Sequence, residues 1–359
     1  MPRAHNFCAG PCTLPLSVLT ELGEEMTDYL GTGMSVIEMS HRSADYEAVH
    51  NETIALLRRL SGAPDDMHVL LVQGGATLQF AMVPQNLLPA DGRAGYVLSG
   101  AWAKKAYADA ARIGGAYQAW APTEGPTRMP EPHEVAVEDG SAYVHVTSIE
   151  TNEGVRMRTF AGYGARLVAD MSSDYLARPI EWDLFDLIYG GVQKNLGPSG
   201  LAVVFVRDSV LARTPDSVPS YLRYGYHADA NSLANTPPTF SVWAMGKVLR
   251  WMDDHGGVAA MEERAAARSG LIYQAIDDSG GFYRSPVDPD YRSHTNVVFR
   301  LPDEGLETEF VAEAEALDIH NLPGHRSVGG IRASVYAALP DESVATLVDF
   351  MGQFAAARG

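Results

Sequence analysis

LVAD at residues 167–170, LFDLIYGGVQK at residues 184–194 and LAVVFV at residues 201–206 form the stretch that decides the fold of this chain. Runs this short and this apolar are typical of strands that are covered on both faces of a sheet. The turn from Asn195 to Gly200 separates the second run from the third. The pattern therefore predicts an α/β protein built on a buried central sheet.

An acid and an amine stand at the carboxyl ends of two of these strands, where open α/β sheets place their chemistry. Asp170 ends the first run, and Lys194 follows the second; the other lysines, Lys104, Lys105 and Lys247, fall in helical segments. A buried amine with a lowered pKa can form a Schiff base with an aldehyde, and a buried carboxylate keeps a pyridine nitrogen protonated. We therefore predict that Lys194 holds pyridoxal phosphate and that Asp170 faces its ring nitrogen.

The net charge, the apolar runs and the cysteines of the chain indicate which partners and which cellular location to expect. The formal net charge of -18 argues against nucleic acid and anionic membrane surfaces. We see no signal peptide and no apolar run long enough to span a bilayer, so a cytoplasmic protein is expected. Cys8 and Cys12 have no second pair, which suggests neither a disulfide framework nor a metal site.

Further motifs are expected at the same sheet edge. Gly74-Gly75 joins a strand at 68–72 to a helix at 77–88, and a small-residue turn at a helix start exposes the backbone amides that bind phosphate. Trp102 begins a helix after the strand 96–99, where its indole can stack on a flat ring. A polar loop, 148–154, follows the strand 143–147. These motifs predict a phosphate-bearing aromatic ligand.

Two His-Arg pairs are candidates for anion recognition. His41 and Arg42 end a segment, 35–42, that we expect to be extended, while His325 and Arg326 precede Arg332 in a glycine-rich stretch. Paired cations suit a dianionic phosphate, and a lone guanidinium such as that of Arg332 suits a carboxylate. A substrate that carries both groups is the natural inference.

Over essentially its whole length the chain resembles the phosphoserine aminotransferase family, in the class V group of fold-type I pyridoxal-phosphate enzymes. The motifs that carry the resemblance occur in the family's order: Asn6-Phe7 with Gly10-Pro11, Ser40-His41-Arg42, Gly74 to Phe80, Trp102, Ala169-Asp170 with Ser172-Ser173, Gln193-Lys194-Asn195 with Gly197-Pro198, Asn235 to Thr239, and Gly324-His325-Arg326 with Gly329-Gly330 and Arg332. The loop before Thr151 departs from the family, because Ile149 stands where Asn is frequent, and the residues after Thr151 also differ.

The resemblance implies a role for each candidate site residue. Lys194 would bind the cofactor covalently, Asp170 would pair with the pyridinium, Trp102 would stack on the ring and Thr151 would bond its hydroxyl side. The cofactor phosphate would be held by Ala76, Thr77 and Gln193, and by Asn235 and Thr236 of a second subunit. Arg332 would bind the substrate α-carboxylate. The substrate phosphate would be held by His325 and Arg326, with His41 and Arg42 of the partner.

The implied fold is a large cofactor-binding domain with a mostly parallel central sheet, residues 13–255, and a smaller α+β domain, residues 256–359, against which residues 1–12 pack. The implied reaction transfers the amino group of glutamate to 3-phosphohydroxypyruvate, in serine biosynthesis and also in pyridoxine biosynthesis, within a homodimer that shares its active sites. Two alternatives remain open. One is another class V enzyme, such as a serine:glyoxylate aminotransferase or a cysteine desulfurase; the other is a nucleotide-binding α/β protein that uses the Gly74-Gly75 turn.

Overall fold

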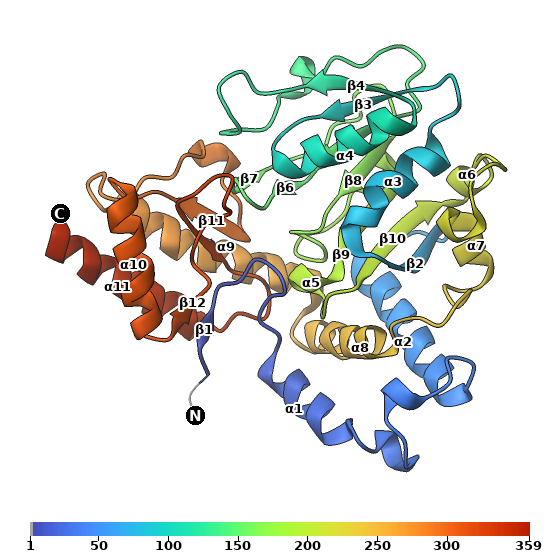
Figure 1. The fold of residues 1–359 in the computed structure, drawn as a ribbon, viewed down its shortest axis with the longest axis horizontal. Helices are drawn as coiled ribbons and strands as arrows, with labels where there is room; N and C mark the ends of the chain where they lie inside the picture. The colour runs from blue at the N-terminus through green and yellow to red at the C-terminus, as the bar shows by residue number, and fades with distance from the viewer. Residues whose placement is uncertain (1–2) are drawn as a thin grey trace.

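A seven-stranded sheet forms the centre of the computed structural model, which describes residues 3–359 (Figure 1). Within this sheet only β10 is antiparallel to its neighbours, so the prediction of an α/β fold with a mostly parallel sheet is confirmed. From one edge to the other the strands are β2 (Met67–Gln73), β10 (Leu201–Arg207), β9 (Phe185–Gly191), β8 (Leu167–Asp170), β5 (Tyr143–Thr147), β3 (Arg93–Val97) and β4 (Gly115–Trp120).

Alternating side chains of the strands pack into two cores, one on each face of the sheet. Leu201, Val203 and Phe205 of β10 belong to one core, and Val204 and Val206 belong to the other. The first core also holds side chains of α2 (Ala44–Ser61) and α8 (Thr239–Asp254), and the second holds side chains of α3 (Gly75–Leu87), α4 (Ala101–Ile113) and α7 (Tyr224–Asp229).

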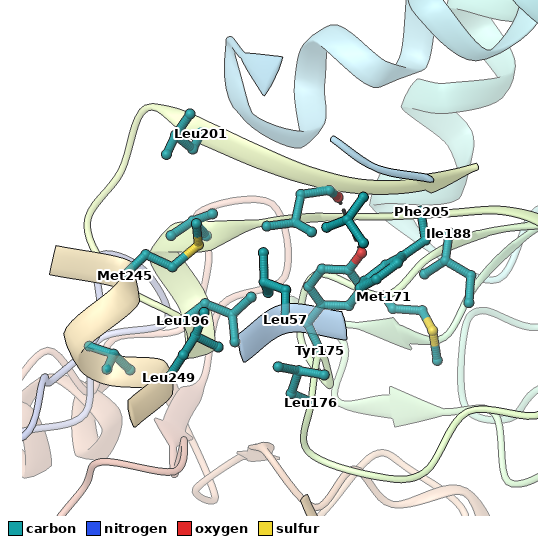
Figure 2. Close-up of a cluster of buried hydrophobic side chains, with 14 of the residues drawn as sticks. Leu57, Met171, Tyr175, Leu176, Ile188, Leu196, Leu201, Phe205, Met245 and Leu249 are labelled. Atoms are coloured by element: carbon teal, nitrogen blue, oxygen red, sulfur yellow. Dashed lines mark hydrogen bonds between the residues drawn. The ribbon is translucent and has the colours of Figure 1, made fainter. Parts of the chain in front are cut away.

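Figure 2 shows the first core, where Leu57 of α2 and Met245 of α8 lie beside Leu201 and Phe205 of the sheet. Tyr175 is also fully buried there, and its hydroxyl donates a hydrogen bond to the carbonyl of Val203 (3.2 Å). The sheet is thus covered on both faces, and polar side chains such as that of Asp170 become accessible where its strands end.

A smaller α+β layer follows in the chain and lies to one side of the sheet (Figure 1). It contains the antiparallel pair β11 (Asn296–Phe299) and β13 (Ile331–Ser334), with α10 (Glu304–Ala316) and α11 (Asp341–Arg358), around a third core that includes Phe310. The short strand β1 (His5–Asn6) pairs in parallel with β12 (Ile319–His320), and Phe7 is buried in the same core. The helix α9 (Gly257–Asp277) places Met261 in the first core and Ile272 in the third. The domain boundary at 255/256 stays a prediction.

The segment that precedes α2 differs from our expectation. Residues 35–42 are not extended, because Val36–Glu38 form the 3₁₀ turn η2. The Ser35 hydroxyl accepts a hydrogen bond from Ile37 N, and the Glu38 carboxylate accepts one from Ser35 N, which is a capping arrangement that favours a helical turn. The same segment continues from α1 (Leu16–Glu25) and the turn η1 (Tyr29–Gly31).

The remaining elements are short connections. They are η3 (Pro132–Glu134), β6 (Ile149–Glu150), β7 (Val155–Arg156), η4 (Trp182–Leu184), α5 (Val192–Asn195), α6 (Asp208–Leu211), η5 (Ser220–Leu222) and η6 (Pro289–Tyr291). Among residues 3–359 no helix combines the length and the apolar character needed to cross a bilayer.

Candidate active site

A cavity of about 750 Å³ lies where the parallel strands of the sheet end. Gln73 ends β2, Asp170 ends β8, and Lys194 lies just after β9. Residues from the N-termini of α3 and α4 and from the α+β layer complete the wall. The residues that line the cavity are Ala9, Gly10, Pro11, Gln73, Gly74, Gly75, Ala76, Thr77, Phe80, Trp102, Thr151, Asn152, Asp170, Ser172, Gln193, Lys194, Ser199, Gly200, Pro238, His325 and Arg332.

The amine of Lys194 is buried in this cavity, with 9% of the residue exposed. Its Nζ donates hydrogen bonds to Thr151 Oγ1 (2.6 Å) and Ser173 Oγ (3.0 Å). Burial lowers the pKa of Lys194 from its ordinary value of 10.5 to about 8, although the carboxylates of Asp170 and Glu150 oppose that change. A substantial fraction of the amine is therefore neutral near physiological pH, and a neutral amine is the nucleophilic form.

The carboxylate of Asp170 is fixed by its neighbour Ser172. Asp170 Oδ1 accepts hydrogen bonds from Ser172 N (2.9 Å) and Ser172 Oγ (2.6 Å), and Ser172 Oγ accepts one from Gly191 N (3.0 Å). Burial raises the pKa of Asp170, and the Lys194 amine and the Ser172 hydrogen bonds oppose the rise. Both bonds go to Oδ1, which leaves Oδ2 as the oxygen available to a ligand.

An indole and two acidic side chains form the next part of the wall. The Trp102 ring lies at the start of α4, with its centroid 5.5 Å from Lys194 Nζ. Glu150 accepts hydrogen bonds from Trp102 N (2.9 Å) and Ala103 N (3.0 Å), and Glu153 accepts one from Ala101 N (3.0 Å). The carboxylates thus satisfy free amides of the helix N-terminus and link Trp102 to the loop that carries Thr151.

The turn between β2 and α3 forms an amide-rich corner. Gly74 and Gly75 have φ of +91° and +64°, a conformation that disfavours other residues, and a Cβ on Gly74 would lie 2.9 Å from Leu78 Cβ. The first amides of α3, which include those of Ala76 and Thr77, have no partner within the helix. Gln193 also lines the cavity. This corner can bind a phosphate through backbone N–H groups and the helix dipole.

Arg332 and His325, two side chains of the α+β layer, complete the cavity. Arg332, on β13, donates a hydrogen bond from Nη1 to Asn152 Oδ1 (3.1 Å). His325 lies near Arg332, Lys105 and Arg326, and its pKa is lowered by partial burial and by these positive charges. The Arg332 guanidinium in the wall, with the positive charges of Lys105 and Arg326 nearby, can bind an anionic substrate.

The structure thus brings together nine of the predicted site residues: Ala76, Thr77, Trp102, Thr151, Asp170, Gln193, Lys194, His325 and Arg332. The others, His41, Arg42, Asn235, Thr236 and Arg326, are not among the residues that line the cavity. Arg326 is exposed next to His325, while Asn235 and Thr236 are exposed near Gln73, whose Nε2 donates to the Thr236 carbonyl (3.1 Å). Their roles stay predictions.

Sequence reasoning gave no role to five residues that the structure places in or beside the cavity wall: Glu150, Asn152, Glu153, Ser172 and Ser173. Ser173 pairs with Thr151 (Oγ to Oγ, 2.6 Å) and holds the Lys194 amine. Its position directly after Asp170-Met171-Ser172 was a usable signal. The roles of the acids depend on contacts across about 50 residues of chain, for which the sequence carries no local signal.

Comparison with known proteins agrees with this geometry. Residues 4–347 match the family model "Aminotransferase class-V". A phosphoserine aminotransferase of Lysinibacillus sphaericus (strain C3-41) is 48% identical over 354 residues, covering 98% of each chain. The solved phosphoserine aminotransferase from Bacillus circulans subsp. alkalophilus is 48% identical over 99% of both chains, with a TM-score of 0.97. A pyridoxal-phosphate-bound phosphoserine aminotransferase from Trichomonas vaginalis is 34% identical and covers 98% of this chain and all of its own, with a TM-score of 0.94.

Proposed function

Because the chain belongs to the class V aminotransferase family, we propose that it is a phosphoserine aminotransferase, which transfers the amino group of glutamate to 3-phosphohydroxypyruvate. The products are O-phospho-L-serine and 2-oxoglutarate, and the pathway served is serine biosynthesis, with pyridoxine biosynthesis as a second use. One observation carries the proposal: the buried amine of Lys194 and the buried acid of Asp170 line one cavity together with the carboxylate-binding group Arg332.

The enzyme depends on pyridoxal phosphate, and the donor set of the cavity fits that group. Lys194 supplies a primary amine with a lowered pKa, and Asp170 supplies a carboxylate whose Oδ2 can hold the proton of the ring nitrogen. Trp102 offers an aromatic face, and the Gly74-Gly75 corner offers amides for the phosphate. When bound, the cofactor supplies an aldehyde and an electron-withdrawing ring.

The protein's own part in the reaction is to hold groups and to move a proton. Lys194 is the group that can take a proton from the α-carbon of the amino donor, because its pKa is near 8. In the second half of the reaction it can give a proton to the α-carbon of the acceptor. Thr151 and Ser173 fix the Nζ atom between two hydroxyls. Arg332 orients the substrate by its carboxylate, which brings the α-carbon to the amine.

We further propose a homodimer in which Arg42, His41, Asn235 and Thr236 complete the site of the partner. These side chains do not line the cavity of their own chain, although the resemblance assigns them to the site. The surface of the N-terminal segment supports the proposal, because it exposes large apolar side chains: Leu16, Leu19, Leu30, Met34 and Ile37. Apolar groups gathered on one surface segment are typical of a protein interface. The cytoplasmic location also stays a prediction, which cell fractionation checks.

The test of the reaction is a substrate panel with glutamate as the amino donor. Phosphohydroxypyruvate should react far better than hydroxypyruvate, pyruvate or glyoxylate, and a preference for glyoxylate would support a serine:glyoxylate aminotransferase instead. Lys194→Ala should abolish both the transfer and the visible absorption of the bound cofactor. Lys247→Met is the matched control, because Lys247 is equally buried but pairs with Glu21 and Glu25 outside the cavity; it should retain the absorption. A coloured, active Lys194→Ala protein would refute the assignment.

A further inference from the structure

Asn152 lies in the cavity wall with an incomplete set of hydrogen bonds. The residue is 2% exposed and lines the cavity directly after Thr151. Its Oδ1 accepts a hydrogen bond from Arg332 Nη1 (3.1 Å), but its Nδ2 is buried without a hydrogen-bond partner among the described residues. Burying a donor without an acceptor is unfavourable, so such a group is expected to have a partner in the working enzyme.

The chemistry of Arg332 fixes which way the amide points. A guanidinium only donates hydrogen bonds, so the amide oxygen of Asn152 must face Arg332, and the NH₂ group is left for another acceptor. Arg332 Nε and Trp102 Nε1 are also buried without partners in the part of the chain that the structure describes. Three N–H donors of one cavity therefore lack acceptors, and two of them belong to the hydrogen-bonded pair Asn152 and Arg332.

We propose, on the basis of the function proposed above, that Asn152 is a substrate-binding residue whose Nδ2 donates a hydrogen bond to the substrate α-carboxylate beside Arg332. Two oxygens of a planar carboxylate match two adjacent donors. The Oδ1 contact simultaneously fixes the guanidinium, so that Asn152 both binds the carboxylate and positions Arg332. Both substrates of the transfer carry this carboxylate, whereas only one carries a phosphate.

The proposal is tested on the holoenzyme with two variants. Asn152→Asp retains an oxygen for Arg332 but replaces the donor by a negatively charged acceptor, while Asn152→Ala removes both functions and tests the proposal if the aspartate variant does not fold. The KM of glutamate and of phosphohydroxypyruvate should both rise, roughly ten- to hundredfold, with the larger rise in Asn152→Asp. The absorption of the bound cofactor should stay unchanged, because Lys194 bonds to Thr151 and Ser173 rather than to Asn152.

Equilibrium binding of non-reacting probes separates the carboxylate from the phosphate. Glutarate should bind the variants at least tenfold more weakly than it binds the unmodified enzyme, while inorganic phosphate should bind all of them equally. Unchanged KM values in both variants, or a loss confined to phosphate, would overturn the role of Asn152. If the unmodified enzyme itself failed to use glutamate, the proposed function would fail instead, so the two failures are distinguishable.

Discussion

Ser172→Ala should destabilise the folded protein by removing one hydroxyl that makes two buried hydrogen bonds. Gly191 N would lose its acceptor, at a cost of about 1–3 kcal/mol, and Asp170 would lose a charge-assisted bond of about 1.5–3 kcal/mol. We therefore expect the free energy of unfolding to fall by roughly 3–5 kcal/mol at pH 8. Urea denaturation of the cofactor-free protein measures this quantity without a contribution from cofactor binding.

The neighbouring substitution Ser173→Ala is the matched control. Ser173 Oγ contacts Lys194 and Thr151, whereas the hydrogen bonds of Asp170 come from Ser172, so this variant leaves the acid intact. Lys194 keeps its bond to Thr151, and the expected loss is about 1–2 kcal/mol. The two variants delete the same atom one residue apart, which separates the effect on the acid from the effect on the amine.

The pH dependence of the Ser172→Ala defect has a definite sign. Burial already raises the pKa of Asp170, and the bonds from Ser172 oppose this, so the variant should raise that pKa further. A carboxyl with a raised pKa contributes stability below its unfolded pKa and loses it as pH rises through the folded pKa. The defect of the variant should therefore be smaller at pH 5 than at pH 8. Equal losses in Ser172→Ala and Ser173→Ala, or a defect that grows in acid, would refute the reasoning.

Two further predictions concern the helix start at Trp102 and the subunit interface. Burial, and then the neighbouring Glu153, raise the pKa of Glu150 to about 8, although hydrogen-bond donors around the Glu150 carboxyl oppose the rise. The contribution of Glu150 to the stability of the folded protein should therefore be lost as pH rises from about 4.5 to 8. Glu150→Gln should remove that part of the slope in denaturation curves; an unchanged slope would count against the raised pKa. Ile37→Asp, at a residue 53% exposed, should convert a dimer to monomers in sedimentation and lower activity; an intact dimer would exclude this surface.

The sequence predicted the central sheet and the positions of Asp170 and Lys194 at its end, because the signals for both are local. In the runs before Asp170 and Lys194, the side chains that pack into the first and second cores are apolar. A residue that ends such a strand, or follows it, lies at the end of the sheet. The contact between Asn152 and Arg332 joins residues 180 positions apart. No local pattern marks such a pair, and the same holds for the pairing of β1 with β12. The turn at residues 36–38 was missed although Ser35 and Glu38 have the spacing of a capping box, which is a local signal for a helical turn.

The α+β layer is joined to the Lys194 turn by Asn195, the residue that follows Lys194 in the chain. Asn195 Oδ1 accepts a hydrogen bond from Ala337 N (3.0 Å), and its Nδ2 donates one to the Tyr175 carbonyl (2.8 Å). The α9 helix contributes to the first and third cores, and its Arg268 donates a hydrogen bond from Nη1 to the carbonyl of the same Ala337 (2.9 Å). Cutting the chain near residue 255 would thus strip the lysine turn of its anchor and uncover apolar surface. The Lys194 turn and the C-terminal layer therefore depend on each other structurally, and truncation should not separate them.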